Sequence, residues 1–296
     1  MSVEIEDTFA EAFPMLAGRV LVTAENERWA LIAARTATGF ASSIIMSPAE
    51  AGVEGTPVPK EKTPDGRPGY YIQIYHRTGH ELKAQMITRL GQCVLTCPTT
   101  AAFDAMPDAK KRIKVGSAIR LFGDGFEKKD ELNGRKIWRI PVMEGEFIIE
   151  RRFGVKRAVA GGNFLIMAES RDAALTAAEK AVEAIEKVEG VVLPFPGGIC
   201  RSGSKVGSMK YKLPASTNHY FCPALRETLP DSKVPASVKS IYELVFNGLN
   251  PEVVKMATAE GIRAAMGVSG VVKISAVNFG GKLGPVQIRL KDALSN

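Results

Sequence analysis

Glu243 is a charged residue in a segment that is otherwise mostly apolar. In the sequence IYELVF (241–246), a period of two residues places Glu243 on the same strand face as Ile241 and Val245. Burial of a carboxyl in such surroundings raises its pKa and favours the protonated acid. A protonated carboxyl is the form that acts as a general acid on a leaving nitrogen. The alternative from the pattern alone is an edge strand on which Glu243 points into solvent.

Loops rich in glycine and polar residues follow the predicted strands of the second half of the chain. Glycine lets a backbone approach a ligand closely, and the amides of such loops bind anions or an oxyanion. Any single loop is equally well a tight turn, but three long loops in one half of the chain predict a binding cleft. These loops are AGGNF (160–164), PFPGGICRSGSKVG (194–207) and NFGGKLG (278–284), and the first half adds TPDGRPG (63–69) and CPTT (97–100).

Most standard catalytic motifs are missing from the sequence. It contains no GxSxG, no HExxH and no metal-type CxxC pair, and its three histidines, at positions 76, 80 and 219, are scattered. We therefore expect no metal site and no histidine-based triad. The stretch GGICRSGSK (197–205) approaches a phosphate-binding loop, but it has the order Ser204-Lys205 where that motif needs Lys-Ser or Lys-Thr. A nucleotide site of that kind is not predicted.

The composition is typical of a globular protein. Of 296 residues, 45% are hydrophobic and 24% are charged, and the net charge of +7 suits an anionic small molecule or nucleic acid equally. The segment MSVEIEDTFAEAF (1–13) does not resemble a signal peptide, and no apolar run reaches the roughly 18–20 residues of a membrane helix. We expect a cytoplasmic protein without membrane contact. Its four cysteines are then reduced thiols: Cys93, Cys97, Cys200 and Cys222.

Two segments 144 residues apart share one local pattern. VLVTAENERWALIAARTA (20–37) and FLIMAESRDAALTAAEKA (164–181) match at 8 of 18 positions. In each, a short apolar run is followed by a helix N-cap, Asn26 or Ser170. Gly39 and Gly190 stand where a left-handed residue would end each helix. The pattern predicts that the two halves arose by duplication.

The remaining elements complete two strand–helix–strand passages in each half. This order predicts an α+β protein with two ferredoxin-like α/β sandwich lobes related by duplication, an N-terminal lobe at 1–150 and a C-terminal lobe at 151–296. A helix capped by Asn250 begins at Pro251 and ends at Gly267. The other expected elements are strands at 40–46, 69–76, 191–195, 241–249 and 273–279, a helix at 80–90, and strands within 119–149 around a turn at Asn133-Gly134.

Motifs along the whole chain resemble one enzyme family. They are, in order, IEDTFAEAFPM, TATGFASSIIMSPAEAG, TPDGRPG, LGQCVLTCPTT, FGDG-x-EKKDEL-x-GRK, AGGNF, PFPGGI-x-x-SGSKVG and NFGGKLG. The sequence is similar in these stretches to the formylmethanofuran:tetrahydromethanopterin formyltransferases of archaeal and bacterial one-carbon metabolism, including methanogenesis. The stretches GRKIWRIPVMEGEF and RSGSKVGSMKYK look closer to the bacterial members, which are subunits of a formyltransferase/hydrolase complex.

The resemblance implies an activity and partners. Members of the family are two-lobed homotetramers without a metal or prosthetic group, and they move a formyl group between the amine of methanofuran and N5 of tetrahydromethanopterin. Both molecules are coenzyme substrates. Some members work beside formylmethanofuran hydrolase or dehydrogenase subunits. The resemblance also implies that Glu243, in its Tyr-Glu strand, is the acid–base residue of the reaction.

The reaction implied by the resemblance passes through a tetrahedral carbon that bears an oxyanion, in a ternary complex with both coenzymes. Because the coenzymes carry carboxylates and a phosphodiester, cations in or beside the loops are candidate anion partners, Lys210 among them. For each lysine the alternative is a solvated surface charge. The candidate substrate-binding residues are Asn163, Pro196, Gly197, Gly198, Arg201, Ser202, Ser204, Lys205, Asn218, Asn278, Gly280 and Lys282.

Two other functions compete with catalysis. A non-catalytic subunit that binds the coenzyme for a hydrolase complex would carry the same loops. A duplicated ferredoxin-like protein with basic charge could also bind RNA, but the aromatic-rich octapeptide expected on such a sheet is missing, so no nucleic-acid partner is predicted.

Overall fold

The computed structural model describes residues 3–282 and 284–295, so Leu283 of the 278–284 loop lies outside the described residues. The chain forms two compact units: unit 1 comprises Met1–Pro14 and Val159–Asn296, and unit 2 comprises Met15–Ala158. Two long strands, β2 (Phe9–Thr23) and β10 (Phe153–Ala168), each contribute residues to both units. The lobe division at 150/151 stays a prediction.

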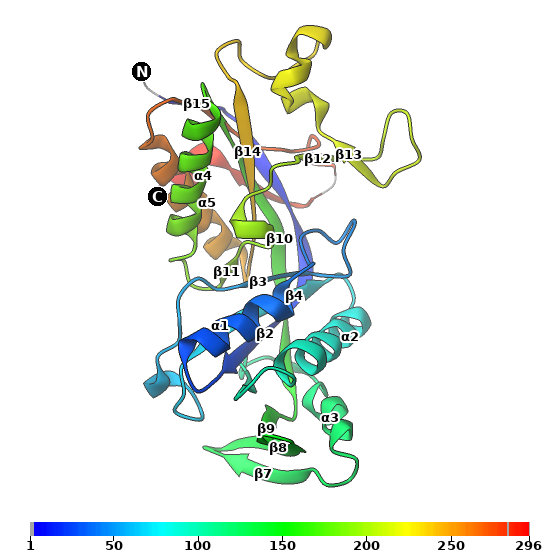
Figure 1. Ribbon diagram of the computed structural model, residues 1–296. Coiled ribbons are helices and arrows are strands. Elements are labelled where there is room, and N and C mark those ends of the chain that lie inside the picture. Colours follow the sequence, from blue (N-terminus) through cyan, green and yellow to red (C-terminus); the bar gives the residue numbers. More distant parts are fainter. Residues whose placement is uncertain (1–2, 283, 296) are drawn as a thin grey trace. The chain divides into compact units, whose positions relative to one another are not determined.

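Unit 2 contains a four-stranded antiparallel sheet in the order β3-β4-β2-β5, with two helices along the chain between its strands (Figure 1). The apolar face of α1 packs against β3 and β4, where alanines of the helix meet Ile72 and Ile74 in one buried core. This strand order is that of a ferredoxin-like fold. After β2 come α1 (Glu27–Thr38), β3 (Glu50–Val53), β4 (Gly69–His76), α2 (Gly79–Arg89) and β5 (Ala101–Asp104).

A β-meander extends unit 2. β9 runs parallel to β5 and antiparallel to β8, and β8 pairs with β7. The turn at Asn133-Gly134 has positive φ at both residues, 48° and 77°, which is the geometry of a tight hairpin. The elements are β6 (Lys111–Ile113), α3 (Gly116–Ile119), β7 (Lys128–Leu132), β8 (Arg135–Val142) and β9 (Gly145–Glu150).

Unit 1 repeats the topology of unit 2. Its antiparallel sheet has the order β11-β14-β10-β15, and α4 and α5 pack side by side on one face of it (Figure 1). β1 (Glu4–Ile5) pairs with β15, and β16 (Val286–Arg289) pairs with residues 9–12 of β2. The α+β class and the ferredoxin-like order of each half are confirmed. After β10 come α4 (Arg171–Ile185), β11 (Val191–Val192), β14 (Ser240–Gly248), α5 (Pro251–Met266), β15 (Val271–Ser275) and, after β16, α6 (Leu290–Leu294).

The predicted helix starts are confirmed. The side chain of Asn26 accepts a hydrogen bond from the amide of Trp29, and Ser170 accepts one from Ala173 in the equivalent position. Asn250 caps α5 in the same way, with Pro251 in its first turn. The same cap chemistry therefore begins a helix after the first strand of each repeat.

Several predicted boundaries are wrong. Gly39 ends α1 with φ −63°, outside the left-handed region, and Gly190 has φ 82° but lies beyond the end of α4. No strand forms at 40–46: the Arg89 guanidinium binds the carbonyls of residues 37, 39 and 40, and Phe40 is 78% exposed. Residues 116–123 are helical, and the strands expected at 191–195 and 273–279 end earlier, at Val192 and Ser275.

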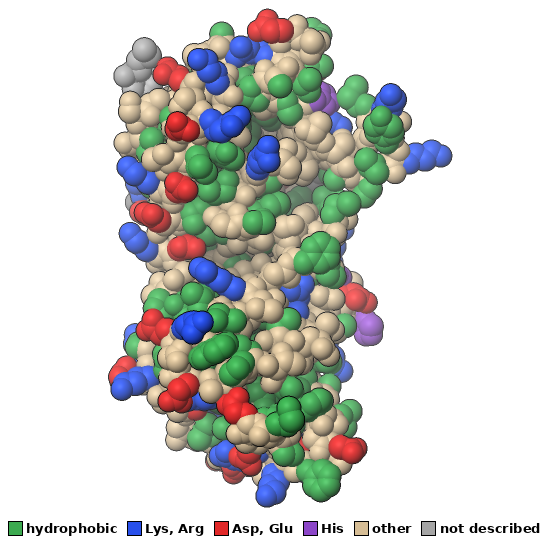
Figure 2. Space-filling model, viewed as in Figure 1, with side chains coloured by type: hydrophobic (Ala, Val, Ile, Leu, Met, Phe, Trp, Pro, Cys, Tyr) green, Lys and Arg blue, Asp and Glu red, His purple; other side chains and the backbone are tan. Residues whose placement is uncertain are grey.

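The surface of the protein carries charges of both signs. On the face drawn in Figure 2, Lys and Arg side chains are interspersed with Asp and Glu. Within the described residues, the helices are too short or too polar to cross a membrane.

The cap of α4 gives a test of the fold. Ser170 satisfies an otherwise unpaired amide of the first turn, so Ser170→Ala should lower the free energy of unfolding by about 1 kcal/mol. Ser170→Asp keeps a side-chain acceptor at the cap and should lower the free energy of unfolding much less. Denaturant titration followed by circular dichroism measures both. Equal losses in the two variants would show that the hydrogen bond to Ala173 does not stabilise the helix.

Candidate functional site

Glu243 lies in the middle of β14 and is paired on both sides. On one side it is opposite Leu165 of β10. On the other side, the backbone amide of Cys200 donates a hydrogen bond to the Glu243 carbonyl (2.8 Å), and the Cys200 carbonyl accepts one from the Glu243 amide (3.1 Å). An edge position is therefore excluded at this residue, and the alternative of a solvent-facing edge glutamate is wrong.

The two faces of β14 have different surroundings. Tyr242, Leu244 and Phe246 pack into the core formed with α4 and α5. Ile241 faces the other way, into a smaller apolar cluster with Leu165. Because side chains alternate along a strand and paired residues share a face, Glu243 lies on the side of Ile241 and Leu165. The predicted alternation is confirmed.

Burial raises the pKa of the Glu243 carboxyl from 4.5 to about 7, and a hydrogen bond with the Cys200 side chain lowers it by a smaller amount. The residue is partly exposed, because it lines a pocket. At neutral pH the acid and the carboxylate are therefore both populated. A group in this state can accept a proton in one step and donate it in the next.

Cys200 hydrogen-bonds with this carboxyl through its side chain. Its thiol is buried and lies 3.5 Å from the hydroxyl of Ser202. Burial, and next the nearby Glu243 charge, raise the pKa of the thiol above 9.0. The thiol is thus protonated at neutral pH and can donate a hydrogen bond to the carboxylate of Glu243.

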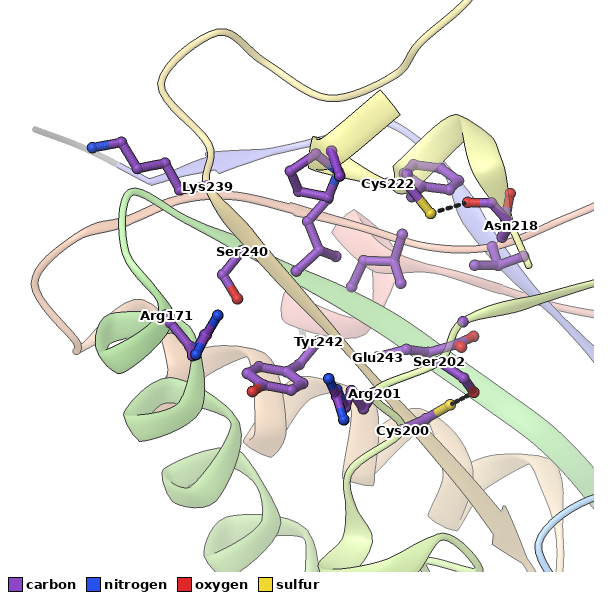
Figure 3. Close-up of a pocket in the computed structure, with 17 residues that line it drawn as sticks. Arg171, Cys200, Arg201, Ser202, Asn218, Cys222, Lys239, Ser240, Tyr242 and Glu243 are labelled. Carbon is purple, nitrogen blue, oxygen red and sulfur yellow. Dashed lines mark hydrogen bonds between the residues drawn. The ribbon is translucent and has the colours of Figure 1, made fainter. Parts of the chain in front are cut away.

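A pocket of about 800 Å³ opens in front of Glu243 (Figure 3). Its wall contains one acidic residue, Glu243, and three cations, Arg171, Arg201 and Lys239. Figure 3 shows the side chains of Glu243 and Ser202 next to each other, beside Cys200. A site with this charge balance suits an anionic substrate whose reacting atoms approach the carboxyl.

A second pocket, of about 270 Å³, lies beside the first and shares the wall residues Asn218, Phe221 and Val277 with it. Lys205 and Asn278, both expected to bind substrate, line this second pocket. The amine of Lys205 donates to the hydroxyl of Ser216 (2.9 Å). Both pockets therefore have cations in their walls, Arg171, Arg201 and Lys239 in the first and Lys205 and Lys233 in the second.

Asn163 and Asn278 hold backbone segments in place. The Asn163 side chain accepts from the amide of Val277 (2.8 Å) and donates to its carbonyl (3.2 Å), so it positions a residue that lines both pockets. The Asn278 amide group donates to the Thr8 hydroxyl (2.9 Å) and the Phe9 carbonyl (3.0 Å). These contacts tie the loop after β15 to the start of the chain.

The other candidate residues do not appear among the described wall residues of either pocket. Gly198 has φ 77°, and an added Cβ would come within 2.8 Å of Val182 on α4, so close packing requires this glycine. Gly280 has φ 70° in a turn, and Lys282 is exposed. The set outside the pocket walls is Asn163, Pro196, Gly197, Gly198, Ser204, Gly280 and Lys282, and their contact with substrate stays a prediction.

Sequence reasoning missed several residues of the main pocket. Arg171 is the first residue of α4, Lys239 immediately precedes β14, and Tyr242 is next to Glu243. The sequence offered a signal for the first two, since each is a cation at the boundary of a predicted element. Across 3–282 and 284–295, three or more His, Cys, Asp or Glu side chains do not come together as a metal site.

Comparison with known proteins identifies the family. Residues 1–142 match the model of the formylmethanofuran–tetrahydromethanopterin formyltransferase family, and residues 145–293 match the model of its proximal lobe. Proteins named formylmethanofuran–tetrahydromethanopterin formyltransferase from Methanocaldococcus jannaschii and Methanopyrus kandleri are each 58% identical; the alignments cover 98% of this chain and 97% and 98% of theirs.

Solved structures that resemble this chain belong to the same family. The formyltransferase of Methanosarcina barkeri superimposes with a TM-score of 0.96 at 51% identity, covering 98% of both chains. A chain of the formyltransferase/hydrolase complex of Methylorubrum extorquens, solved with methylofuran, gives a TM-score of 0.94 at 42% identity, covering 99% of this chain and 97% of that one. Among these four relatives, identity is higher to the archaeal proteins than to the bacterial one. The chain belongs to the family of formylmethanofuran–tetrahydromethanopterin formyltransferases.

Proposed function

We propose that this enzyme transfers a formyl group between the amine of methanofuran and N5 of tetrahydromethanopterin, with Glu243 as the acid–base residue. The observation that carries the proposal is the position of the Glu243 carboxyl: it is buried, has a pKa of about 7, and faces a pocket whose other charged residues are all cations. The names of the relatives supply the two coenzymes.

Glu243 moves one proton between the two nitrogens. N5 of tetrahydromethanopterin attacks the formyl carbon, the C=O electrons move to oxygen, and the proton of N5 passes to the Glu243 carboxylate. The bond from carbon to the methanofuran nitrogen then breaks as the oxyanion collapses. The leaving nitrogen keeps the electron pair and takes the proton from Glu243. A pKa near the working pH suits both halves of this cycle, and the reverse direction uses the same steps.

Other residues of the site would bind and orient the two coenzymes. Arg171, Arg201 and Lys239 would pair with the carboxylates and the phosphodiester of the coenzymes. The Ser202 hydroxyl and the Asn218 amide line the same pocket and are the candidate donors to the oxyanion. The second pocket, with Lys205 and Asn278, would hold a more distant part of one coenzyme.

The assay that tests this function uses the purified chain with formylmethanofuran and tetrahydromethanopterin, and follows N5-formyl product by absorbance. Transfer by the isolated chain supports the proposal. Coenzyme binding without transfer would favour the second candidate, a non-catalytic coenzyme-binding subunit of a hydrolase complex.

We further propose a cytoplasmic homotetramer that associates with formyl hydrolase or dehydrogenase subunits. The support for the association is the Methylorubrum relative, which is a chain of a formyltransferase/hydrolase complex. The tetramer rests on the family resemblance. Light scattering on the purified chain should give the mass of four 31.9-kDa copies. A mass of one copy that does not change with protein concentration would contradict the tetramer.

Replacement of the carboxyl tests its catalytic role. Glu243→Gln keeps the shape of the side chain but cannot take or give the proton, so we expect kcat to fall by about 10²-fold or more with coenzyme Kd values little changed. The matched control is Glu179→Gln on the exposed side of α4, which should not change kcat. Equal kcat for Glu243→Gln and the parent would remove Glu243 from the mechanism.

The pH dependence of the stability of the same variant tests the burial of the carboxyl. Because the folded-state pKa is raised from 4.5 to about 7, the folded state binds the proton more tightly than the unfolded state. The tighter proton binding stabilises the folded state by roughly 3 kcal/mol below about pH 4.5. This stabilisation is lost as the pH rises through about 7. Relative to the parent, Glu243→Gln should therefore gain stability between pH 5 and 8. Denaturant titrations at both pH values measure this; a pH-independent difference would show that the carboxyl is solvated.

A further inference from the structure

Unit 2 contains a pocket of about 1,020 Å³ whose wall is strongly basic. Eight of its described wall residues are Arg or Lys, and one, Glu150, is acidic. This contrasts with the face drawn in Figure 2, where the two signs are interspersed. The pocket shares no described wall residue with the Glu243 pocket, and the proposed formyl transfer uses none of its residues. We call it the basic pocket.

Three of the eight cations are paired within the protein. Arg112 contacts Asp104 (2.9 Å) and Glu150 (3.4 Å), and Arg135 contacts Glu150 (2.7 Å). Arg120 pairs with Glu127. Glu150, the one acidic residue among the described wall residues, is therefore already paired with two of the cations.

The other five cations have no carboxylate partner among the described residues: Lys114, Lys129, Lys136, Arg151 and Arg152. All of them except Arg151 are exposed, and Lys114, Lys136 and Arg152 belong to three separate segments of unit 2. Like charges held together in a concave wall repel one another, and a ligand with several negative charges would relieve that repulsion. The chemistry of the wall therefore calls for a polyanion.

Trp138 holds part of this wall in a defined geometry. Its ring is 7% exposed, and the guanidinium carbons of Arg120 and Arg151 lie 4.8 and 5.0 Å from its centroid. The Nε of Arg151 donates to the carbonyl of Ile137 (3.2 Å), which limits the rotation of the guanidinium. Cations that are ordered in advance lose little freedom when an anion binds. The indole, being buried and contacted by cations, offers no free face on which a nucleic-acid base could stack.

We propose that the basic pocket is the docking site for an acidic segment of a second protein chain. Arginine and lysine bind carboxylates through charge-assisted hydrogen bonds, and the volume holds several side chains rather than one small anion. A relative with the same fold was solved as part of a complex with other subunits, so chains of this architecture do meet protein partners. The proposal is independent of the catalytic role of Glu243.

The test measures binding of a fluorescein-labelled hexa-aspartate peptide to the full-length protein by anisotropy at low and at physiological salt. The parent should bind, with affinity that falls as salt rises. Lys114→Glu/Lys136→Glu/Arg152→Glu should weaken binding at least 10-fold and leave formyl transfer unchanged. The matched control, Lys60→Glu/Lys62→Glu/Lys187→Glu, makes the same change in net charge at exposed positions outside the pocket and should bind within about 2-fold of the parent.

Each other outcome overturns the proposal. No binding by the parent would show that the pocket does not take an acidic peptide. Equal loss of affinity in the two triple variants would show that only the overall charge matters. Competition by a single-stranded RNA or by tripolyphosphate at lower concentration than unlabelled hexa-aspartate would assign the pocket to phosphate groups. If the triple glutamate variant does not fold, as judged by circular dichroism, the triple glutamine variant at the same positions replaces it and should still lose binding at least 10-fold.

Discussion

The burial of one carboxyl, at a residue whose backbone is paired on both sides, is the constraint on which the site depends. Glu243 cannot turn away from the pocket, because its backbone is hydrogen-bonded to Cys200 and the strand pairs with β10 on the other side. Apolar residues on the same face, Leu165 and Ile241, keep water from much of the carboxyl. The fold thus holds, in the wall of the pocket, an acid whose ionised form is destabilised, as the proposed proton transfer requires.

The duplicated topology explains why one unit carries this site. In unit 2 the connection between β3 and β4 is short, residues 54–68, whereas in unit 1 the equivalent connection between β11 and β14 runs over residues 193–239. That longer segment supplies Cys200, Arg201, Ser202 and Asn218, which form much of the pocket wall. The two units share one strand order, but unit 1 carries the pocket of the proposed reaction and unit 2 carries the basic pocket.

Much of the fold could be predicted because its signals are local. The caps Asn26, Ser170 and Asn250 and the alternation of 69–76 each depend on neighbouring residues. The strand expected at 40–46 does not form, because the distant Arg89 binds the carbonyl of Phe40 and the amides of Met46 and Ser47 hydrogen-bond back to the carbonyl of Ser43 in a turn. In the site, too, local signals were predictable and long-range contacts were not. Glu243 was visible as a misplaced charge, but Arg171 and Lys239 join it only through tertiary packing, and the role of Asn163 in holding Val277 spans 114 residues.

The proposed mechanism requires the Glu243 carboxyl to titrate near neutrality in the free enzyme. Carbon-13 NMR of protein labelled at the glutamate side-chain carboxyl carbon reads each titration directly, and the resonance missing from Glu243→Gln assigns this one. The mechanism predicts a pKa of about 7 for that resonance. A pKa near the ordinary 4.5 would contradict it, because the carboxyl would then be solvated and ionised throughout the neutral range.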